Sequence, residues 1–251
     1  HPNIMKIYDV VTSDEQVWIV TEWLRGQSLS EQKLPLPPTV ILAVMAQVYD
    51  ALDAAHSADV IHRDIKPANV MINEDGRVIL IDFGVAFAPG FSTGQTMVGS
   101  MRYTDPRILE GLPPDAHSDL FAAGLLQLQL MTGQFVAPDI APLPLYRFMR
   151  KSLASRVNQL TDGTYPPLAD LARRILLRPG GAIDKTLSAK QAAAQAKKLL
   201  LKLTGSSPQE YLARTLCTGH LIDHNAEILM IKEVNKAIRS KNLSPKQKAA
   251  W

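Results

Sequence analysis

Apolar and polar positions in the first 24 residues alternate in the short runs that are typical of β-strands. Residues 4–8 and 17–24 are rich in Ile, Val, Tyr and Trp, and the polar residues 12–15 separate them. This pattern predicts a β-hairpin. Farther along, apolar residues recur every three or four positions between Ile41 and Ala55, which predicts an amphipathic helix.

The middle of the chain combines strand and helix patterns. Two apolar runs, residues 70–72 and 78–81, flank the turn sequence Asn-Glu-Asp-Gly and predict a second hairpin. Residues 120–131 are almost wholly apolar and are followed by Gly133. A helix that is apolar on all sides is buried, and glycine is the usual residue just past a helix end. We therefore expect a central buried helix here.

The last third of the chain is helical in pattern. Residues 168–177 and 188–203 predict two helices, the second with Ser188 as its N-cap. Residues 205–210 read Gly-Ser-Ser-Pro-Gln-Glu and predict a linker. Strands in the first part and helices in the second predict the α+β class.

Composition and charge narrow the class of protein. The 251 residues are 46% apolar and 20% charged, which is typical of a globular domain, and the net charge of +3 is too small to argue for nucleic acid. Residues 205–251 contain seven Lys/Arg and four Asp/Glu, so this tail carries the whole excess. The longest apolar run is too short for a membrane span. One cysteine excludes an internal disulfide and suits a reducing compartment, so we expect a cytoplasmic location.

The motifs that carry chemistry flank the second predicted hairpin on either side. Residues 62–69 read His-Arg-Asp-Ile-Lys-Pro-Ala-Asn, and Asp-Phe-Gly follows at 82–84. With these motifs the chain resembles the eukaryotic-type (Hanks-type) serine/threonine protein kinases. The resemblance implies a protein-kinase-like fold, ATP and Mg²⁺ as cofactors, and protein Ser/Thr hydroxyls as substrate.

The resemblance also assigns roles to single residues. Asp64 would orient the substrate hydroxyl and accept its proton, and Lys66 would offset charge on the transferred phosphate. Asn69 and Asp82 would supply oxygen ligands for Mg²⁺, which prefers such hard ligands. Lys66 followed by proline is similar to the serine/threonine branch of the family.

Other stretches match the nucleotide pocket of the same family. Residues 19–24 resemble its hinge, so Thr21 would be the gatekeeper and the backbones of Glu22 and Leu24 would bind adenine, with Met71 beneath the ring. The resemblance further implies that His62 packs under Phe83, together with Ile7.

Residues 99–107, before the buried helix, read Gly-Ser-Met-Arg-Tyr-Thr-Asp-Pro-Arg and resemble the end of the family's activation segment. In the family this part helps to form the pocket for the substrate residue after the phosphoacceptor, a role that would fall to Ser100. Ser92, Thr93 and Thr96 would be phosphorylation sites with Arg63 as the phosphate receptor, and Asp119 would cap the catalytic loop.

Asp105 and Arg107 depart from the family's Ala-Pro-Glu pattern. The usual glutamate pairs with an arginine, for which Lys185 is the nearest candidate here. Two cations cannot form that ion pair, so we expect the activation segment to be anchored differently or loosely.

The residues contain no glycine-rich loop and no Val-Ala-x-Lys strand motif, both of which grip ATP in the family. We therefore predict a truncated catalytic domain: an N-lobe remnant at 1–24, the C-lobe at 25–204, and a basic helical extension at 205–251 that contacts a partner. Alone, this chain should phosphorylate proteins poorly.

Two alternatives stay open. The chain as a whole could be a pseudokinase-like interaction module. Its tail could hold a zinc site at Cys217, His220 and His224, for which no fourth ligand is evident.

Overall fold

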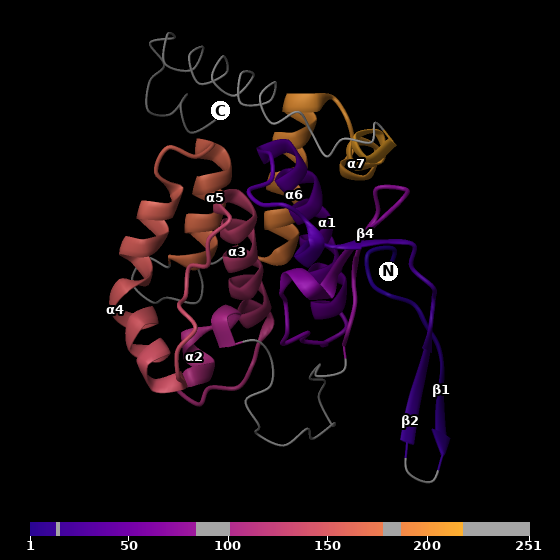
Figure 1. Ribbon diagram of the computed structural model, residues 1–251, viewed down its shortest axis with the longest axis horizontal. Helices are drawn as coiled ribbons and strands as arrows, with labels where there is room; N and C mark the ends of the chain where they lie inside the picture. The colour runs from indigo at the N-terminus through magenta and orange to yellow at the C-terminus, as the bar shows by residue number, and fades with distance from the viewer. Residues whose placement is uncertain (14–15, 84–100, 178–186, 218–251) are drawn as a thin grey trace.

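A computed structural model describes residues 1–13, 16–83, 101–177 and 187–217 (Figure 1). Two small sheets adjoin a set of helices, which confirms the predicted α+β fold with a mainly helical lobe and an N-terminal hairpin. The strands are β1 Ile7–Ser13, β2 Gln16–Thr21, β3 Gly26–Ser28, β4 Val70–Asn73 and β5 Val78–Leu80. The α-helices are α1 Pro38–His56, α2 Pro106–Leu109, α3 Ala116–Thr132, α4 Pro142–Thr161, α5 Pro166–Leu176, α6 Ala189–Thr204 and α7 Pro208–Cys217, with 3₁₀ turns at Leu29–Glu31, Pro67–Asn69 and Met101–Tyr103.

Helices α1 and α3 form the centre of the molecule (Figure 1). Helix α1 starts with Pro38, whose missing N–H costs nothing in a first turn, and most of the helix is buried. Helix α3 is capped by Asp115, which accepts a hydrogen bond from the Ser118 N–H, and ends at Gly133 with φ 69°. The predicted buried helix and its glycine terminus are therefore confirmed.

The two sheets are separate and both antiparallel. Strands β1 and β2 form the predicted N-terminal hairpin, with an irregularity in register between Ile7 and Asp9. Strands β3, β4 and β5 form a second sheet in that order. The predicted turn between β4 and β5 is present, and Gly76 in it has φ 72°, a conformation that favours glycine.

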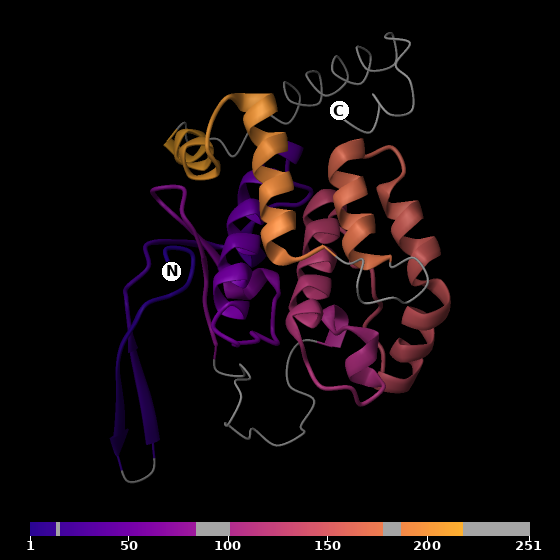
Figure 2. The same ribbon diagram turned by 180° about the vertical axis from the view of Figure 1, so that it is seen from behind.

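The β1–β2 hairpin projects away from the helical body in both views (Figures 1 and 2). Several of its apolar side chains are exposed, among them Ile7 at 51% and Ile19 at 54%. The expected packing of Ile7 into a buried contact with His62 and Phe83 is therefore wrong for this structure, because half of the Ile7 surface is exposed.

Several elements were not predicted correctly from the sequence. Strand β3 and helices α2 and α4 were missed, because β3 and α2 have only three and four residues and α4 has a mixed polar pattern. The stretch 205–210 is a linker only in its first half, since α7 begins at Pro208 and packs against α1. The division into domains stays a prediction.

Within the part of the chain that the structure describes, no helix combines the length and the apolar character that crossing a bilayer requires.

The contact between α3 and α5 is close enough to exclude a methyl group. A Cβ atom on Gly124 would lie 2.8 Å from Ile175 Cγ2 and 3.0 Å from Leu176 Cδ2. We predict that Gly124→Ala lowers the free energy of unfolding by about 1–3 kcal/mol, as overpacking does in dense cores.

Urea denaturation of the single and double variants would check this prediction. Adding Ile175→Ala removes the side chain that meets the new methyl group, so the double variant should lose less stability than the sum of the two single variants. Strict additivity would contradict the close contact.

Candidate active site

The catalytic loop brings three of the predicted site residues into direct contact. Lys66 Nζ lies 2.5 Å from Asp64 Oδ2, and Asn69 Nδ2 donates to the same oxygen at 2.9 Å. Asn69 Nδ2 also donates to the backbone oxygen of Asp64 at 2.9 Å. Asp64 and Asn69 are buried, while Lys66 is partly exposed. The carboxylate of Asp64 is therefore held in one orientation by an amide and an ammonium group.

The donor atoms of Asn69 and Asp82 are of the type that suits a hard cation. Both bonds to Asp64 use the amide nitrogen of Asn69, which leaves its side-chain oxygen to face another group. Asp82 is exposed, has φ 63°, and follows directly after β5 and Ile81. An amide oxygen and one carboxylate, completed by phosphate oxygens, are a donor set that Mg²⁺ accepts. Among the described residues no group of three or more His, Cys, Asp or Glu side chains could hold a metal ion by itself.

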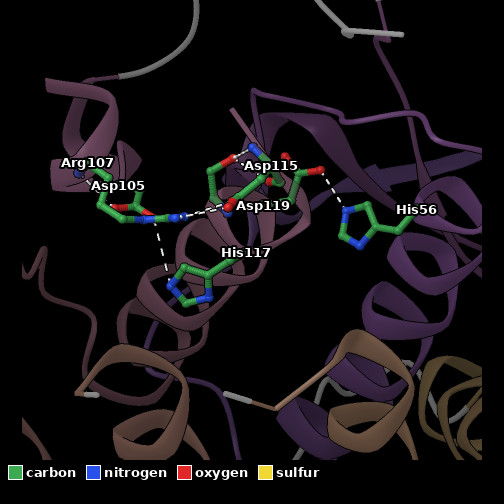
Figure 3. A network of polar contacts seen from close by, with 7 residues as sticks. His56, Asp105, Arg107, Asp115, His117 and Asp119 are labelled. Carbon is green, nitrogen blue, oxygen red and sulfur yellow. Dashed lines mark hydrogen bonds and ion pairs between the residues drawn. The ribbon is translucent and has the colours of Figure 1, made fainter. Parts of the chain in front are cut away.

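Asp119 fixes the backbone that precedes Asp64. Its carboxylate accepts hydrogen bonds from the backbone N–H groups of His62 and Arg63, each at 2.8 Å. It also lies 2.9 Å from Nε2 of His56 at the end of α1 (Figure 3). Arg63 has φ 70°, a conformation that costs energy for a residue with a side chain. The predicted capping of the catalytic loop by Asp119 is confirmed.

His62 joins the loop at residues 62–69 to residues 81–83, which follow β5. Its ring packs against Phe83 with 4.4 Å between ring centroids, and Nε2 lies 3.1 Å from the backbone oxygen of Ile81. The predicted contact of His62 with Phe83 is confirmed. Burial lowers the pKa of His62 below its usual 6.5, although Asp119 and other carboxylates oppose the shift. His62 is therefore a neutral packing group at pH 7.

The residues predicted to form the hinge lie at the end of β2 and directly after it. Thr21 Oγ1 donates to the backbone oxygen of Glu22 at 3.2 Å. The carboxylate of Glu22 accepts from the backbone N–H of Lys6 at 2.9 Å and lies 3.3 Å from Arg77 Nη2. This carboxylate links the base of the N-terminal hairpin to the turn between β4 and β5, a contact that the sequence did not reveal.

Leu24 and Met71 are the other residues predicted for the nucleotide pocket. Leu24 and Met71 are half-buried, and Met71 lies in β4 opposite Ser28 of β3. Trp23 is 88% exposed between Glu22 and Leu24. The backbone groups predicted to bind adenine therefore lie on an extended segment between the two sheets.

Arg107 is anchored by acidic residues near it in sequence (Figure 3). Its guanidinium binds both carboxylate oxygens of Asp115, at 2.7 and 2.9 Å, and lies within 3.0 Å of Asp105 Oδ2. His117 Nε2 lies 3.8 Å from the same Asp105 oxygen. Hydrogen bonding to Asp115, and then to Asp105, raises the pKa of Arg107 against the effect of burial.

This network confirms the expectation that the segment is anchored differently from the family pattern. Asp115 is also the N-cap of α3, so one carboxylate ties α2 to the start of α3. Sequence reasoning missed Asp115 and His117. The charge pattern around Arg107, with one aspartate two residues before it and another eight residues after it, was the available signal.

Several predicted site residues lie outside the described part of the chain: Ser92, Thr93, Thr96, Ser100, Lys185, His220 and His224. Their assigned roles stay predictions.

Comparisons with known proteins agree with the motifs. A family model described as the protein kinase domain matches residues 1–220. The chain is 34% identical over 166 residues to the probable serine/threonine-protein kinase PknB of Lactococcus lactis, which covers 63% of this chain and 26% of that protein.

Two further relatives give the same result. The serine/threonine-protein kinase PrkC of Bacillus subtilis is 36% identical over 140 residues, covering 53% of this chain and 22% of PrkC. The serine/threonine-protein kinase PknL of Mycobacterium tuberculosis is 31% identical over 175 residues, covering 67% of this chain and 44% of PknL. The chain spans less than half the length of each of these relatives.

We predict that Arg107→Ala lowers the free energy of unfolding by about 3 kcal/mol, because it leaves the buried carboxylate of Asp105 without its cation. Arg107→Lys should lose less, since it keeps the charge but not the two-point contact with Asp115. Urea denaturation would measure both.

Arg150→Ala is the matched control, because Arg150 is largely exposed and pairs with Glu110 at 3.2 Å. It should cost less than about 1 kcal/mol. Equal losses at Arg107 and Arg150 would contradict the anchoring role.

The lowered pKa of His62 predicts an acid-sensitive fold. Below pH 6.5 the unfolded chain binds a proton at this histidine while the folded chain does not, so folding stability falls as the pH falls. The loss should reach at most about 1.4 kcal/mol per pH unit until the folded-state pKa is passed. In His62→Gln this part of the pH dependence should be absent, as urea denaturation between pH 7.5 and 5 would show. An unchanged pH profile in the variant would exclude His62 as the source.

Proposed function

The chain belongs to the protein kinase family, and we propose that it is the phosphoryl-transfer part of a serine/threonine protein kinase. The reaction would move the γ-phosphate of ATP to a Ser or Thr hydroxyl of a protein substrate. The observation that carries the proposal is the cluster of Asp64, Lys66 and Asn69, in which one buried carboxylate is oriented by two nitrogen donors. Phosphoryl transfer depends on such positioning more than on covalent help from the protein.

Asp64 is the residue that orients and deprotonates the substrate hydroxyl. A general base must be held within hydrogen-bond reach of the proton that it accepts. The amide of Asn69 and the ammonium of Lys66 restrict the Asp64 side chain, and Asp119 fixes the backbone before it. Carboxylate orientation is therefore set by the folded chain before any substrate arrives.

Lys66 and the metal-binding pair manage charge on the phosphates. Lys66 is partly exposed beside Asp64, so its ammonium can reach a phosphate oxygen as the transfer proceeds. Asn69 and Asp82 would hold Mg²⁺ through an amide and a carboxylate oxygen. When bound, Mg²⁺ neutralises charge on the β- and γ-phosphates.

The remaining assignments complete the proposal. Thr21, Glu22 and Leu24 form the adenine hinge above Met71. Arg63 receives a phosphate carried by Ser92, Thr93 or Thr96, and Ser100 lines the pocket of the protein substrate. The basic tail contacts a protein partner, and the enzyme works in the cytoplasm, where ATP is abundant and a lone thiol stays reduced.

Phosphate transfer from radiolabelled ATP to a generic protein substrate tests the proposal. The chain joined to an N-lobe that supplies the glycine-rich loop and the ATP-binding lysine should transfer phosphate, while the 251-residue chain alone should transfer little. Asp64→Ala and Asp82→Ala should each lower kcat by at least about 100-fold, because each removes a group that acts in the transition state.

Asp170→Ala removes an exposed carboxylate on α5 and is the matched control, with unchanged turnover expected. Near-normal turnover of the Asp64 or Asp82 variant would overturn the assigned roles. No transfer by the chain joined to an N-lobe would favour the alternative of an interaction module.

A further inference from the structure

Helix α7 lies directly against the turn between β4 and β5 (Figure 2). A Cβ atom on Gly76 would lie 2.3 Å from the backbone nitrogen of Ala213 and 2.4 Å from the backbone oxygen of Gln209. Only glycine fits this approach, and Gly76 also has a positive φ of 72°. The backbones of the turn and the helix are therefore in contact without any intervening side chain.

The same helix is fixed to α1 by a polar and an apolar contact. The hydroxyl of Tyr211 lies 2.7 Å from Thr39 Oγ1, and Thr39 is buried. Leu212 is fully buried in the core. Helix α7 is thus seated on the long central helix on one side and on the β4–β5 turn on the other.

The β4–β5 turn also makes hydrogen bonds to α1 and to the predicted hinge. Gln47 of α1 donates to the backbone oxygen of Gly76 at 3.1 Å and accepts from the backbone N–H of Val78 at 3.0 Å. Arg77 reaches the hinge residue Glu22 at 3.3 Å. A shift of this turn would therefore change the position of Glu22 at the predicted hinge and of strands β4 and β5.

The opposite end of β4 and β5 carries the two predicted metal ligands. Asn69 directly precedes β4, and Asp82 comes two residues after Leu80, the last residue of β5. The backbone N–H of Ile81 donates to the oxygen of Asn69 at 3.0 Å and closes this end of the hairpin. Four residues of β4 separate the two ends, a distance of roughly 13 Å in an extended strand.

We propose that α7 is a positioning element of the nucleotide site, and that Leu212 and Tyr211 are its positioning residues. By holding the turn, α7 limits the opening of the β4–β5 hairpin and so fixes the spacing of Asn69 and Asp82. Coupling of this kind travels through packed elements that have an open and a closed arrangement. The assignment rests on the proposed function for its consequence, because Asn69 and Asp82 matter only if they bind a metal.

Amide hydrogen exchange of the full chain tests the inference without nucleotide. In Leu212→Ala the amide of Ile81 should exchange at least about tenfold faster relative to the buried amide of Leu126 in α3, which reports global opening. Leu212→Met should restore the wild-type ratio, since methionine refills the volume. Tyr211→Phe, which removes a single hydroxyl, should raise the exchange of Ile81 relative to Leu126 by a smaller factor. If Leu212→Ala does not fold, this second variant tests the inference in its place.

Leu200→Ala is the matched control, because Leu200 is equally buried on α6. It should destabilise the fold without changing the ratio between Ile81 and Leu126. Equal ratios in all variants, or faster exchange confined to α7, would overturn the inference.

Binding of Mg²⁺ with the non-hydrolysable analogue AMP-PNP separates this inference from the proposed function when it is measured on the chain joined to an N-lobe that supplies the glycine-rich loop and the ATP-binding lysine. In this extended chain, weaker binding in Leu212→Ala than in Leu200→Ala supports the positioning role. If the analogue does not bind to the extended wild-type chain while the exchange result holds, the proposed function fails and the structural coupling stands.

Discussion

The catalytic loop depends on one buried carboxylate. Asp119 is 1% exposed, and a buried charge of this kind is costly unless hydrogen bonds replace its water. Two backbone N–H groups of the loop and the ring of His56 supply those bonds. The same bonds hold Arg63 at a positive φ, which the residue would not adopt by itself. The hydrogen bonds to Asp119 therefore offset both the cost of burying its carboxylate and the cost of the strained backbone at Arg63.

The anchoring of Arg107 shows how an altered motif can keep a structural role. A glutamate at this position would need a cation from a distant part of the chain. Arginine instead needs carboxylates, and Asp105 and Asp115 lie on the same short segment. A planar guanidinium can serve both at once, because it offers several N–H donors in a fixed geometry. The reversal of charge therefore replaces a long-range ion pair by a local one.

The sequence predicted the parts of this structure in which a local signal and the fold agree. The apolar run 120–131 gave α3, the Asn-Glu-Asp-Gly turn gave the β4–β5 hairpin, and the motif at 62–69 gave the contacting site residues. The start of helix α7, which lies inside the predicted helical extension, was missed because Gly-Ser-Ser-Pro favours a turn, although Ser207 with Glu210 three residues later is a capping-box pattern. The contact of α7 with Gly76 joins segments more than 130 residues apart, and no local pattern specifies it.

The spacing of Asp115 and Asp119 explains how the catalytic loop and the segment around Arg107 are held at a fixed position relative to each other. Residues four apart lie on the same face of a helix, and both carboxylates are at the N-terminal end of α3, where the helix dipole favours negative charge. Asp119 holds the catalytic loop, and Asp115 holds Arg107 at the end of the activation segment. Because one rigid turn of helix carries both anchors, the loop and the segment cannot shift relative to one another without breaking a charge-assisted hydrogen bond.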